Sequence, residues 1–168
     1  MNNQAKNWIE RLQLSAHPEG GYFKETYRST ETICRECLPE RFPASRVFST
    51  AIYFLLAEND FSALHRIKQD EIWHFHDGSA LTIHIFDTAG RYHTRILGKE
   101  TDKGAEPQII VKAGDIFGAE LIDKTSFTLA GCTVAPGFDY ADFELLPRSE
   151  LQCQFPGYRE IIRRLTRS

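Results

Sequence analysis

The densest group of chemically reactive side chains lies between residues 61 and 78, in the stretch FSALHRIKQDEIWHFHDG. His65 precedes a turn-like Lys-Gln-Asp segment, and Glu71 follows it. Imidazole and carboxylate are the groups that a metal site or a general acid–base pair requires. His65 and Glu71 are therefore our first candidates for proton transfer. The alternative is a hydrogen-bonded pair inside the core that carries out no chemistry.

Strand geometry limits which of these side chains can meet, because neighbouring residues of a strand point to opposite faces. Glu71 and Trp73 then share one face. If the chain folds back at Gly78 and Ser79, His84 lies opposite Trp73 and beside the face of Glu71. We therefore predict that Trp73 and His84 line the same site as Glu71.

A second candidate segment, Tyr22–Ser29, follows the two glycines of HPEGG and alternates along its length. Glu25 and Tyr27 fall on one side of this strand, and Arg28 falls on the other. Glu25 either points to water or pairs with a base or a ligand donor in a pocket, because a buried carboxylate without a partner is costly. Arg28 is the better candidate for binding an anion, because a guanidinium grips a carboxylate or phosphate with two parallel hydrogen bonds.

Short strands must position these residues, because most of the chain shows strand patterns with turn signals such as Asp77-Gly78-Ser79 between them. We find no helix-length pattern among these strands, which argues against βαβ units and favours a closed or double-sheet antiparallel fold. The predicted strands are Tyr22–Ser29, Val47–Leu56, Phe61–Ile67, Glu71–His76, Leu81–Asp87, Tyr92–Leu97, Gln108–Val111, Asp115–Ile122, Phe127–Val134 and Tyr140–Leu145.

Two short helices are predicted near the ends of the chain, over Gln4–Leu12 and Tyr158–Leu165, where apolar residues share one face. A long polar loop, Glu31–Arg46, follows the first long strand. The 168 residues are about the size of one domain. We therefore predict one domain over residues 1–168, an all-β antiparallel jelly roll or small β-barrel with short terminal helices.

The composition excludes several classes of protein. A net charge of −3 gives no field that attracts nucleic acid or anionic lipid. The longest apolar stretch, Ala51–Ala57, is far shorter than the about 20 residues that span a bilayer, and the first residues have no apolar signal-peptide region. We therefore expect a cytoplasmic protein with no nucleic-acid or membrane partner. Its four cysteines, including the pair Cys34 and Cys37, are expected to be reduced thiols.

The spacing His65-x-Ile67-x3-Glu71-x6-Gly78 resembles the first motif of cupins, with His65 at the first histidine and Glu71 at the glutamate. Ile67 stands where the second histidine belongs. Gly114-Asp115 resembles the start of the second cupin motif, but its proline and histidine are missing. Four segments are similar to the Cupin_5 group, a domain of unknown function: His17–Ser29, His65–Gly78, Pro107–Glu120 and Leu129–Leu145.

This resemblance implies a cupin jelly-roll barrel, with a ligand pocket inside and a dimeric assembly. It is also similar in architecture to the sugar-nucleotide epimerase (RmlC-like) and phosphomannose isomerase branches of the superfamily. We therefore expect a small polar ligand, sugar-like or carboxylated, and an isomerase or epimerase in which His65 is the base, oriented by Glu71, and Tyr27 or Tyr53 is the acid. The residues expected to bind the ligand are Glu25, Arg28, Tyr53, Trp73, His84, Gln108 and Phe117.

Two alternatives remain open, a metabolite-binding cupin without catalysis and a metal-dependent oxygenase. A cupin metal site uses three histidines and one glutamate, and only His65 and Glu71 match it. Two ligands do not hold a divalent ion tightly. We therefore expect no cofactor, with a divalent metal completed by His74 or His84 as the lesser alternative.

The apolar strands 47–56 and 127–134 carry more aliphatic surface than one barrel needs inside, and the edges of open sheets must be covered. We therefore expect a homodimer. Its interface would include the outer face of Val47–Leu56 or the strand Tyr22–Ser29.

Overall fold

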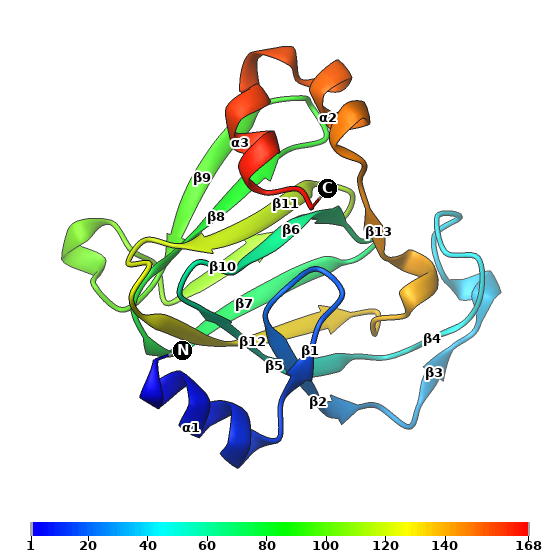
Figure 1. The fold of residues 1–168 in the computed structure, drawn as a ribbon. Helices are drawn as coiled ribbons and strands as arrows, with labels where there is room; N and C mark the ends of the chain where they lie inside the picture. The colour runs from blue at the N-terminus through cyan, green and yellow to red at the C-terminus, as the bar shows by residue number, and fades with distance from the viewer. Residues whose placement is uncertain (1, 168) are drawn as a thin grey trace.

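The structure, a computed structural model, describes residues 2–167 as two facing antiparallel sheets with helices on their outer sides (Figure 1). One sheet has the order β1-β2-β5-β12-β7-β10, and the other has the order β13-β6-β11-β8-β9. The predicted all-β jelly roll with short terminal helices is confirmed. Within the described residues the ladders form these two separate sheets and do not close into one continuous barrel.

The six-stranded sheet carries most of the long strands. Its members are β1 (Ser15–Ala16), β2 (Tyr22–Arg28), β5 (Thr50–Ala57), β12 (Phe127–Ala135), β7 (Asp70–Gly78) and β10 (Gln108–Val111). The five-stranded sheet consists of β13 (Glu144–Leu145), β6 (Phe61–Arg66), β11 (Ile116–Leu121), β8 (Leu81–Phe86) and β9 (Tyr92–Leu97). A separate two-stranded ladder joins β3 (Thr32–Ile33) and β4 (Arg46–Val47).

The predicted hairpin between β7 and β8 is wrong. β7 pairs with β12 and β10, whereas β8 pairs with β11 and β9, so the turn at Gly78 carries the chain from one sheet to the other. Gly78 has a φ of 94°, and a Cβ there would lie 2.1 Å from the carbonyl oxygen of Phe127. The glycine therefore allows the chain to pass close to the backbone of Phe127. From the sequence alone, the same glycine is equally compatible with a tight two-residue hairpin turn. As a result His84 lies opposite Thr94 and Gly118, and not opposite Trp73.

The main core fills the space between the sheets with side chains from both inner faces, including Phe54, Trp73, Ile83 and Phe117. Two further clusters bury the outer faces. Helix α1 (Asn3–Leu12) covers part of the six-stranded sheet, packing near Leu55. The terminal helices therefore bury part of the outer apolar surface that the two sheets would leave exposed.

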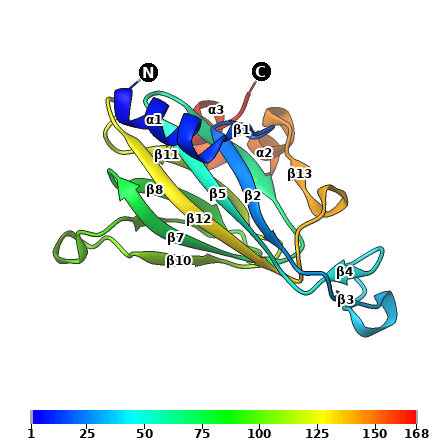
Figure 2. The ribbon, with the colours of Figure 1, turned by 90° about the horizontal axis from the view of Figure 1, so that it is seen from below.

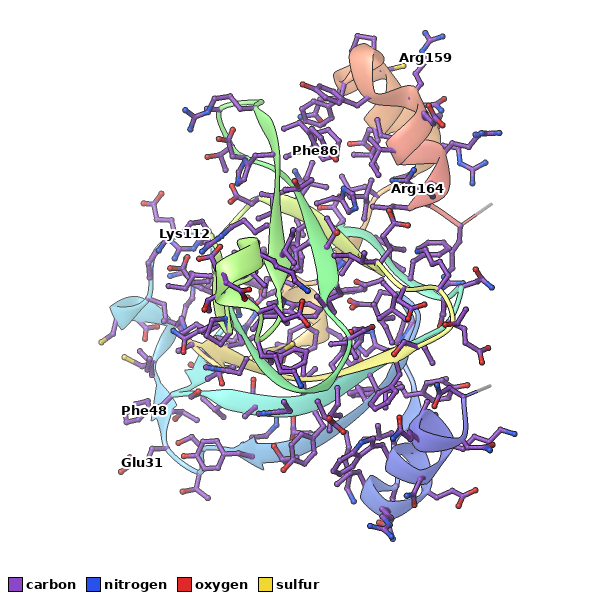
Figure 3. The ribbon with its side chains drawn as sticks, turned by 90° about the vertical axis from the view of Figure 1, so that its left-hand side faces the viewer. Glu31, Phe48, Phe86, Lys112, Arg159 and Arg164 are labelled. Atoms are coloured by element: carbon purple, nitrogen blue, oxygen red, sulfur yellow. The ribbon has the colours of Figure 1, made fainter. Side chains whose placement is uncertain are left out.

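The C-terminal helices α2 (Arg148–Gln154) and α3 (Arg159–Arg164) cover the outer face of the five-stranded sheet. Phe86 lies between this sheet and the helices (Figure 3) and contacts the ring of Phe155 at a centroid distance of 4.5 Å. Among the residues that the structure describes, no helix combines the length and the apolar character needed to cross a bilayer.

Candidate functional site

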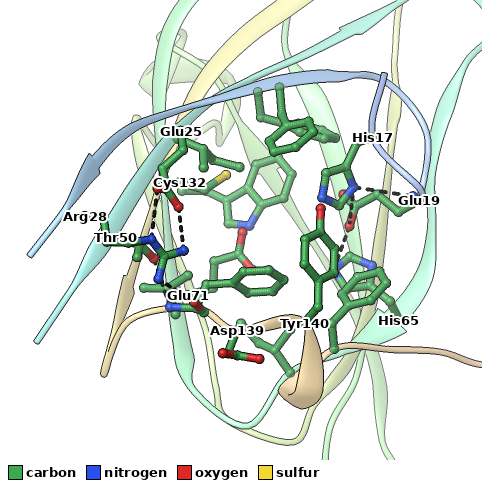
Figure 4. Close-up of a pocket in the computed structure, with 18 residues that line it drawn as sticks. His17, Glu19, Glu25, Arg28, Thr50, His65, Glu71, Cys132, Asp139 and Tyr140 are labelled. Atoms are coloured by element: carbon green, nitrogen blue, oxygen red, sulfur yellow. Dashed lines mark hydrogen bonds and ion pairs between the residues drawn. The ribbon is translucent and has the colours of Figure 1, made fainter. Parts of the chain in front are cut away.

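A cavity of about 410 Å³ lies against the inner face of the six-stranded sheet (Figure 4). Residues of β2, β5, β7 and β12 form its wall, and His65 of β6 reaches it from the opposite sheet. The segment 138–143 closes one side, and the loop 17–19 closes another. The cavity is therefore built from parts of the chain that are far apart in sequence.

Strand alternation and register explain which side chains enter the cavity. On β7, Glu71 and Trp73 point inward, two residues apart. β12 pairs with β7 so that Cys132 lies opposite Trp73 and Val134 lies opposite Glu71. The thiol of Cys132 and the carboxyl group of Glu71 thereby line the same cavity wall, and each influences the pKa of the other.

At one end of the cavity, Glu19 makes three close contacts. Its Oε1 accepts a hydrogen bond of 2.8 Å from the Ser62 hydroxyl. Its Oε2 lies 3.3 Å from Nε2 of His65 and 3.5 Å from Nδ1 of His17. Glu19 and His65 are only 5% and 2% exposed, so this acid–base cluster is shielded from bulk water.

The contacts of His65 define where its protons lie. Nδ1 is 2.7 Å from the carbonyl oxygen of Ala63, which can only accept, so Nδ1 carries a hydrogen and donates it. In the neutral ring Nε2 is then unprotonated, and the 3.3 Å contact with Glu19 holds one proton between the two side chains. Burial lowers the pKa of His65 and raises the pKa of Glu19 to about 7. Below about pH 7 that proton therefore resides on Glu19.

Glu71 is the second buried acid of the cavity. Burial raises the pKa of Glu71 to about 7, and the nearby charge of Glu19 adds to this rise, while His65 opposes it. Burial, together with the neighbouring charge of Glu71, also raises the pKa of the Cys132 thiol, which keeps its proton. The cavity thus holds two carboxyl groups that change protonation near pH 7, with His65 close to both.

The mouth of the cavity carries an ion pair. The Arg28 guanidinium donates to both oxygens of Glu25, at 3.0 and 2.6 Å, and a further nitrogen donates to the carbonyl oxygen of Phe138 at 3.3 Å. A register shift in the pairing of β2 with β5, between Glu25 and Tyr27, explains how both partners reach the cavity. Without this bulge, alternation would place Glu25 and Arg28 on opposite faces.

The predicted position of Tyr27 in the site is wrong, and the same bulge is the reason. Its side chain lies outside the cavity, 54% exposed, because the extra residue turns Arg28 inward in its place. Tyr53 also lies outside: it alternates with Ile52 and Phe54, and its ring lies 5.8 Å from that of His76 on the outer face. Neither tyrosine is placed to serve as the acid of the cavity.

Three other predicted ligand-binding residues lie elsewhere. His84 faces the outer side of the five-stranded sheet, where Nδ1 is 2.7 Å from the Tyr92 hydroxyl, because β7 and β8 belong to different sheets. Gln108 is exposed on β10, at the sheet edge. Phe117 is fully buried, and its ring centroid is 4.1 Å from that of His65, so it packs behind the histidine. His65, Glu71, Glu25, Arg28 and Trp73 are the predicted site residues that line the cavity.

Sequence reasoning missed His17, Glu19, Cys132, Asp139 and Tyr140, which also line the cavity. The signal for the first two is the pair of glycines that follows them in HPEGG. Gly21 has a φ of 72°, and a Cβ there would lie 2.7 Å from the carbonyl oxygen of Leu55. The glycines therefore seat the loop directly on β5, which brings the preceding histidine and glutamate to the cavity.

Several solved structures are similar to this chain in fold. The chain is 36% identical to a protein of Shewanella oneidensis, with a TM-score of 0.88 and 99% of each chain covered. It is 33% identical to a hypothetical protein from Leishmania major, with a TM-score of 0.86. That match covers 98% of this chain and 99% of the Leishmania protein. Oxalate decarboxylase from Bacillus subtilis is more distant, at 15% identity and a TM-score of 0.55, and the match covers 89% of this chain and 36% of the decarboxylase.

Oxalate decarboxylase from Bacillus subtilis has Mn(II) centres. Between residues 2 and 167 there is no group of three or more His, Cys, Asp or Glu side chains placed to hold a metal ion. The apolar side chain of Ile67 lines the cavity two residues after His65. The described side chains therefore do not fit a cupin metal site of three histidines and one glutamate.

The remaining comparisons concern sequence alone. A search of curated proteins found no match. The family model of the cupin superfamily domain DUF985, Cupin_5, matches residues 6–146, which include the wall, both ends and the mouth of the cavity. The predicted family is confirmed, and the chain belongs to the Cupin_5 (DUF985) family of the cupin superfamily.

Proposed function

We propose that the protein binds a small, neutral, polyhydroxylated molecule in this cavity and acts on it as an isomerase or epimerase. The observation that carries this proposal is the presence of two buried carboxyl groups, Glu19 and Glu71, with pKa values of about 7 in one cavity with His65. Groups that titrate near the working pH are the most efficient general acids and bases.

The charges around the cavity favour a neutral ligand over a carboxylated one. Arg28 is the one arginine among the lining residues, no lysine joins it there, and both oxygens of Glu25 already neutralise it. Asp139 adds a further negative charge beside it. An anionic ligand would therefore have to displace Glu25 before it could pair with the guanidinium.

Trp73 supplies a contact for an oxygen of the ligand. Its indole nitrogen is buried in the cavity wall and has no hydrogen-bond partner among the described residues. A buried N–H without an acceptor is costly, and a ligand hydroxyl or carbonyl oxygen would satisfy it. The aromatic rings of Phe54 and Phe23 provide the apolar surface that such pockets use to hold the body of a ligand.

In the proposed reaction, one buried group removes a proton from the carbon next to the carbonyl of an open-chain sugar, and the other protonates the carbonyl oxygen to give an enediol. Return of a proton to the former carbonyl carbon, with loss of the proton from the hydroxyl on the neighbouring carbon, gives the isomer. Return of a proton to the opposite face of the first carbon, with loss of the proton placed on the former carbonyl oxygen, gives the epimer. Glu71 supplies one of these groups. The Glu19–His65 pair, which shares one proton, supplies the other.

Solvent deuterium exchange tests this proposal. The protein is incubated in D2O with a panel of aldoses and ketoses, and incorporation of deuterium next to the carbonyl is followed by NMR. We expect exchange with at least one sugar, and a loss of about 100-fold or more in Glu71→Gln. Glu10→Gln, an exposed change on α1, serves as the matched control and should exchange at the wild-type rate.

Thermal-shift binding with the same sugars and with the corresponding aldonic acids tests the class of ligand. Stabilisation by sugars but not by their acids supports the charge argument. Stabilisation by sugars without deuterium exchange would contradict catalysis and leave a metabolite-binding cupin. Stabilisation by the acids alone would contradict the proposed ligand class.

A further inference from the structure

The long polar segment 31–48 forms an arm that projects from one end of the sheets (Figure 2). Its base is the short ladder of β3 and β4, in which Ile33 lies opposite Arg46. Arg46 is 4% exposed, and its guanidinium donates to both oxygens of the buried Asp142 at 2.7 and 2.6 Å. The arm is therefore fixed to the body of the protein through Arg46 and also through Arg41, whose guanidinium donates to the carbonyl oxygen of Lys68 at 2.8 Å.

Two cysteines meet on this arm. Cys34 precedes the 3-10 helix η1 (Arg35–Cys37), and the helical turn brings its sulfur to 2.8 Å from the sulfur of Cys37. Both side chains are exposed. The two thiols are therefore hydrogen-bonded to each other and accessible to dissolved small molecules.

The turn is held in this shape by its own backbone contacts. The Arg35 guanidinium donates to the carbonyl oxygens of Leu38 and Glu40 at 3.4 and 3.3 Å, and the Arg35 amide donates to the Ser45 hydroxyl at 3.1 Å. The two sulfurs are thus kept together by the fold of the arm. Their separation of 2.8 Å exceeds the about 2.05 Å of a disulfide bond by less than 1 Å.

We propose that Cys34 and Cys37 form a redox site that exchanges reversibly with the disulfides of low-molecular-weight thiols. The Cys34 thiolate attacks one sulfur of such a disulfide, forms a mixed disulfide and releases one thiolate. Cys37 then loses its proton to solvent and attacks the sulfur of Cys34. This step forms the Cys34–Cys37 bond and releases the second thiolate, so that the protein loses two electrons and the small disulfide gains them.

The direction of the pKa shift at Cys37 supports this order of the two steps. The hydrogen bond and the adjacent Cys34 sulfur raise the pKa of the Cys37 thiol. Cys37 therefore retains its proton while Cys34 makes the first attack, and it acts second as the resolving thiol.

The test uses the full chain, equilibrated over a range of ratios of reduced to oxidised glutathione, quenched in acid and alkylated in denaturant before its intact mass is measured. We expect two of the four cysteines to escape alkylation together, with the loss of two hydrogens. Cys153→Ser, which changes an exposed cysteine without a second sulfur beside it, is the matched control and should give the same disulfide. Cys37→Ser should instead accumulate a mixed disulfide on Cys34.

Trypsin identifies the bond directly, because cleavage after Arg35 places the two cysteines on different peptides, 29–35 and 36–41. A linked pair of these peptides, separated by reduction, supports the proposal. Two results would overturn it: four alkylated thiols at every glutathione ratio, or separate glutathione adducts on Cys34 and Cys37 in the wild type with no linked peptides.

Discussion

Glu71 illustrates how a single buried side chain links the chemistry of the cavity to the stability of the fold. Its pKa of about 7, above the usual value of 4.5, means that folding favours the protonated form. The contribution of this neutral carboxyl to stability is fully present below pH 4.5 and is lost as the pH rises through about 7. Above that pH the fold must hold a buried negative charge.

We predict that Glu71→Gln stabilises the protein at pH 8 and changes its stability little at pH 5. A shift from 4.5 to about 7 corresponds to a gain of up to about 3 kcal/mol at the higher pH. Urea denaturation of wild type and variant at both pH values measures this difference. An equal loss of stability at the two pH values would mean that the carboxyl stabilises the fold by packing and hydrogen bonding alone.

His65 carries a second prediction at the scale of one residue. Because Nδ1 donates to the carbonyl oxygen of Ala63, the neutral ring should have its hydrogen on Nδ1. Burial lowers its pKa, so the ring should remain neutral at pH 7. Nitrogen-15 NMR distinguishes the two tautomers, and His65→Gln identifies the signal. A ring protonated on Nε2 alone, or on both nitrogens at pH 7, would contradict this assignment.

The residues of the cavity differ in how far sequence reasoning could reach them. His65 and Glu71 stand out because imidazole and carboxylate recur on adjacent strands at a known motif spacing. Glu19 acquires its chemistry only from the tertiary fold, since Ser62 and His65 come from a distant strand. Tyr27 was placed by simple alternation, which a bulge in β2 interrupts, and a bulge has no reliable signal in this stretch.

At the scale of elements, the positions of the strands were predictable from the sequence, whereas their pairing into sheets was not. Strand patterns predict most of the strands, because half-buried strands alternate in polarity. The partner of each strand is decided by long-range packing, so the turn at Gly78 was predicted as a hairpin although it joins two sheets. The segment 140–145 was predicted as a strand, and it divides into a 3-10 turn, Tyr140–Asp142, and the short strand β13.

The segment 138–143 covers the cavity and is held by the buried ion pair Arg46–Asp142, with Lys68 a further 3.6 Å contact of the same carboxylate. Gln69 also donates to Asp142, at 2.7 Å. We predict that Arg46→Met destabilises the protein by about 3–5 kcal/mol, because it removes the guanidinium that donates to both oxygens of the buried Asp142 carboxylate and leaves only the partly exposed Lys68, 3.6 Å away, as a cation. Urea denaturation provides the measurement.

The double variant Arg46→Met, Asp142→Leu separates the value of the ion pair from the cost of an unpaired charge. Because both charges are removed, most of the lost stability should return. A double variant that is as unstable as the sum of the two single variants would show that the side chains act independently.

At the scale of the whole molecule, the apolar outer surface is partly accounted for within one chain. Helix α1 covers Leu55 and Leu129, which belong to the strands whose aliphatic surplus suggested an interface. In the described chain the edge strands are β1 and β10 of one sheet and β13 and β9 of the other, and β1 pairs with β2 only at Tyr22 and Phe23. Tyr27 on β2 and Phe48 at the base of the arm are 54% and 47% exposed, and Phe48 points away from the sheets (Figure 3).

We propose that these exposed aromatic residues and the neighbouring face of β2 form a two-fold interface between copies of the chain, because aromatic side chains are enriched where proteins associate. A specific interface of this kind should bury more than about 1,000 Å².

Light scattering at micromolar concentration should give about twice the chain mass of 19.3 kDa. Tyr27→Lys with Phe48→Glu should shift the mass to that of one chain, whereas Ile110→Lys on β10 should leave it unchanged. A wild-type mass near 19.3 kDa would show that the helices already cover enough of the apolar surface for one chain to stand alone.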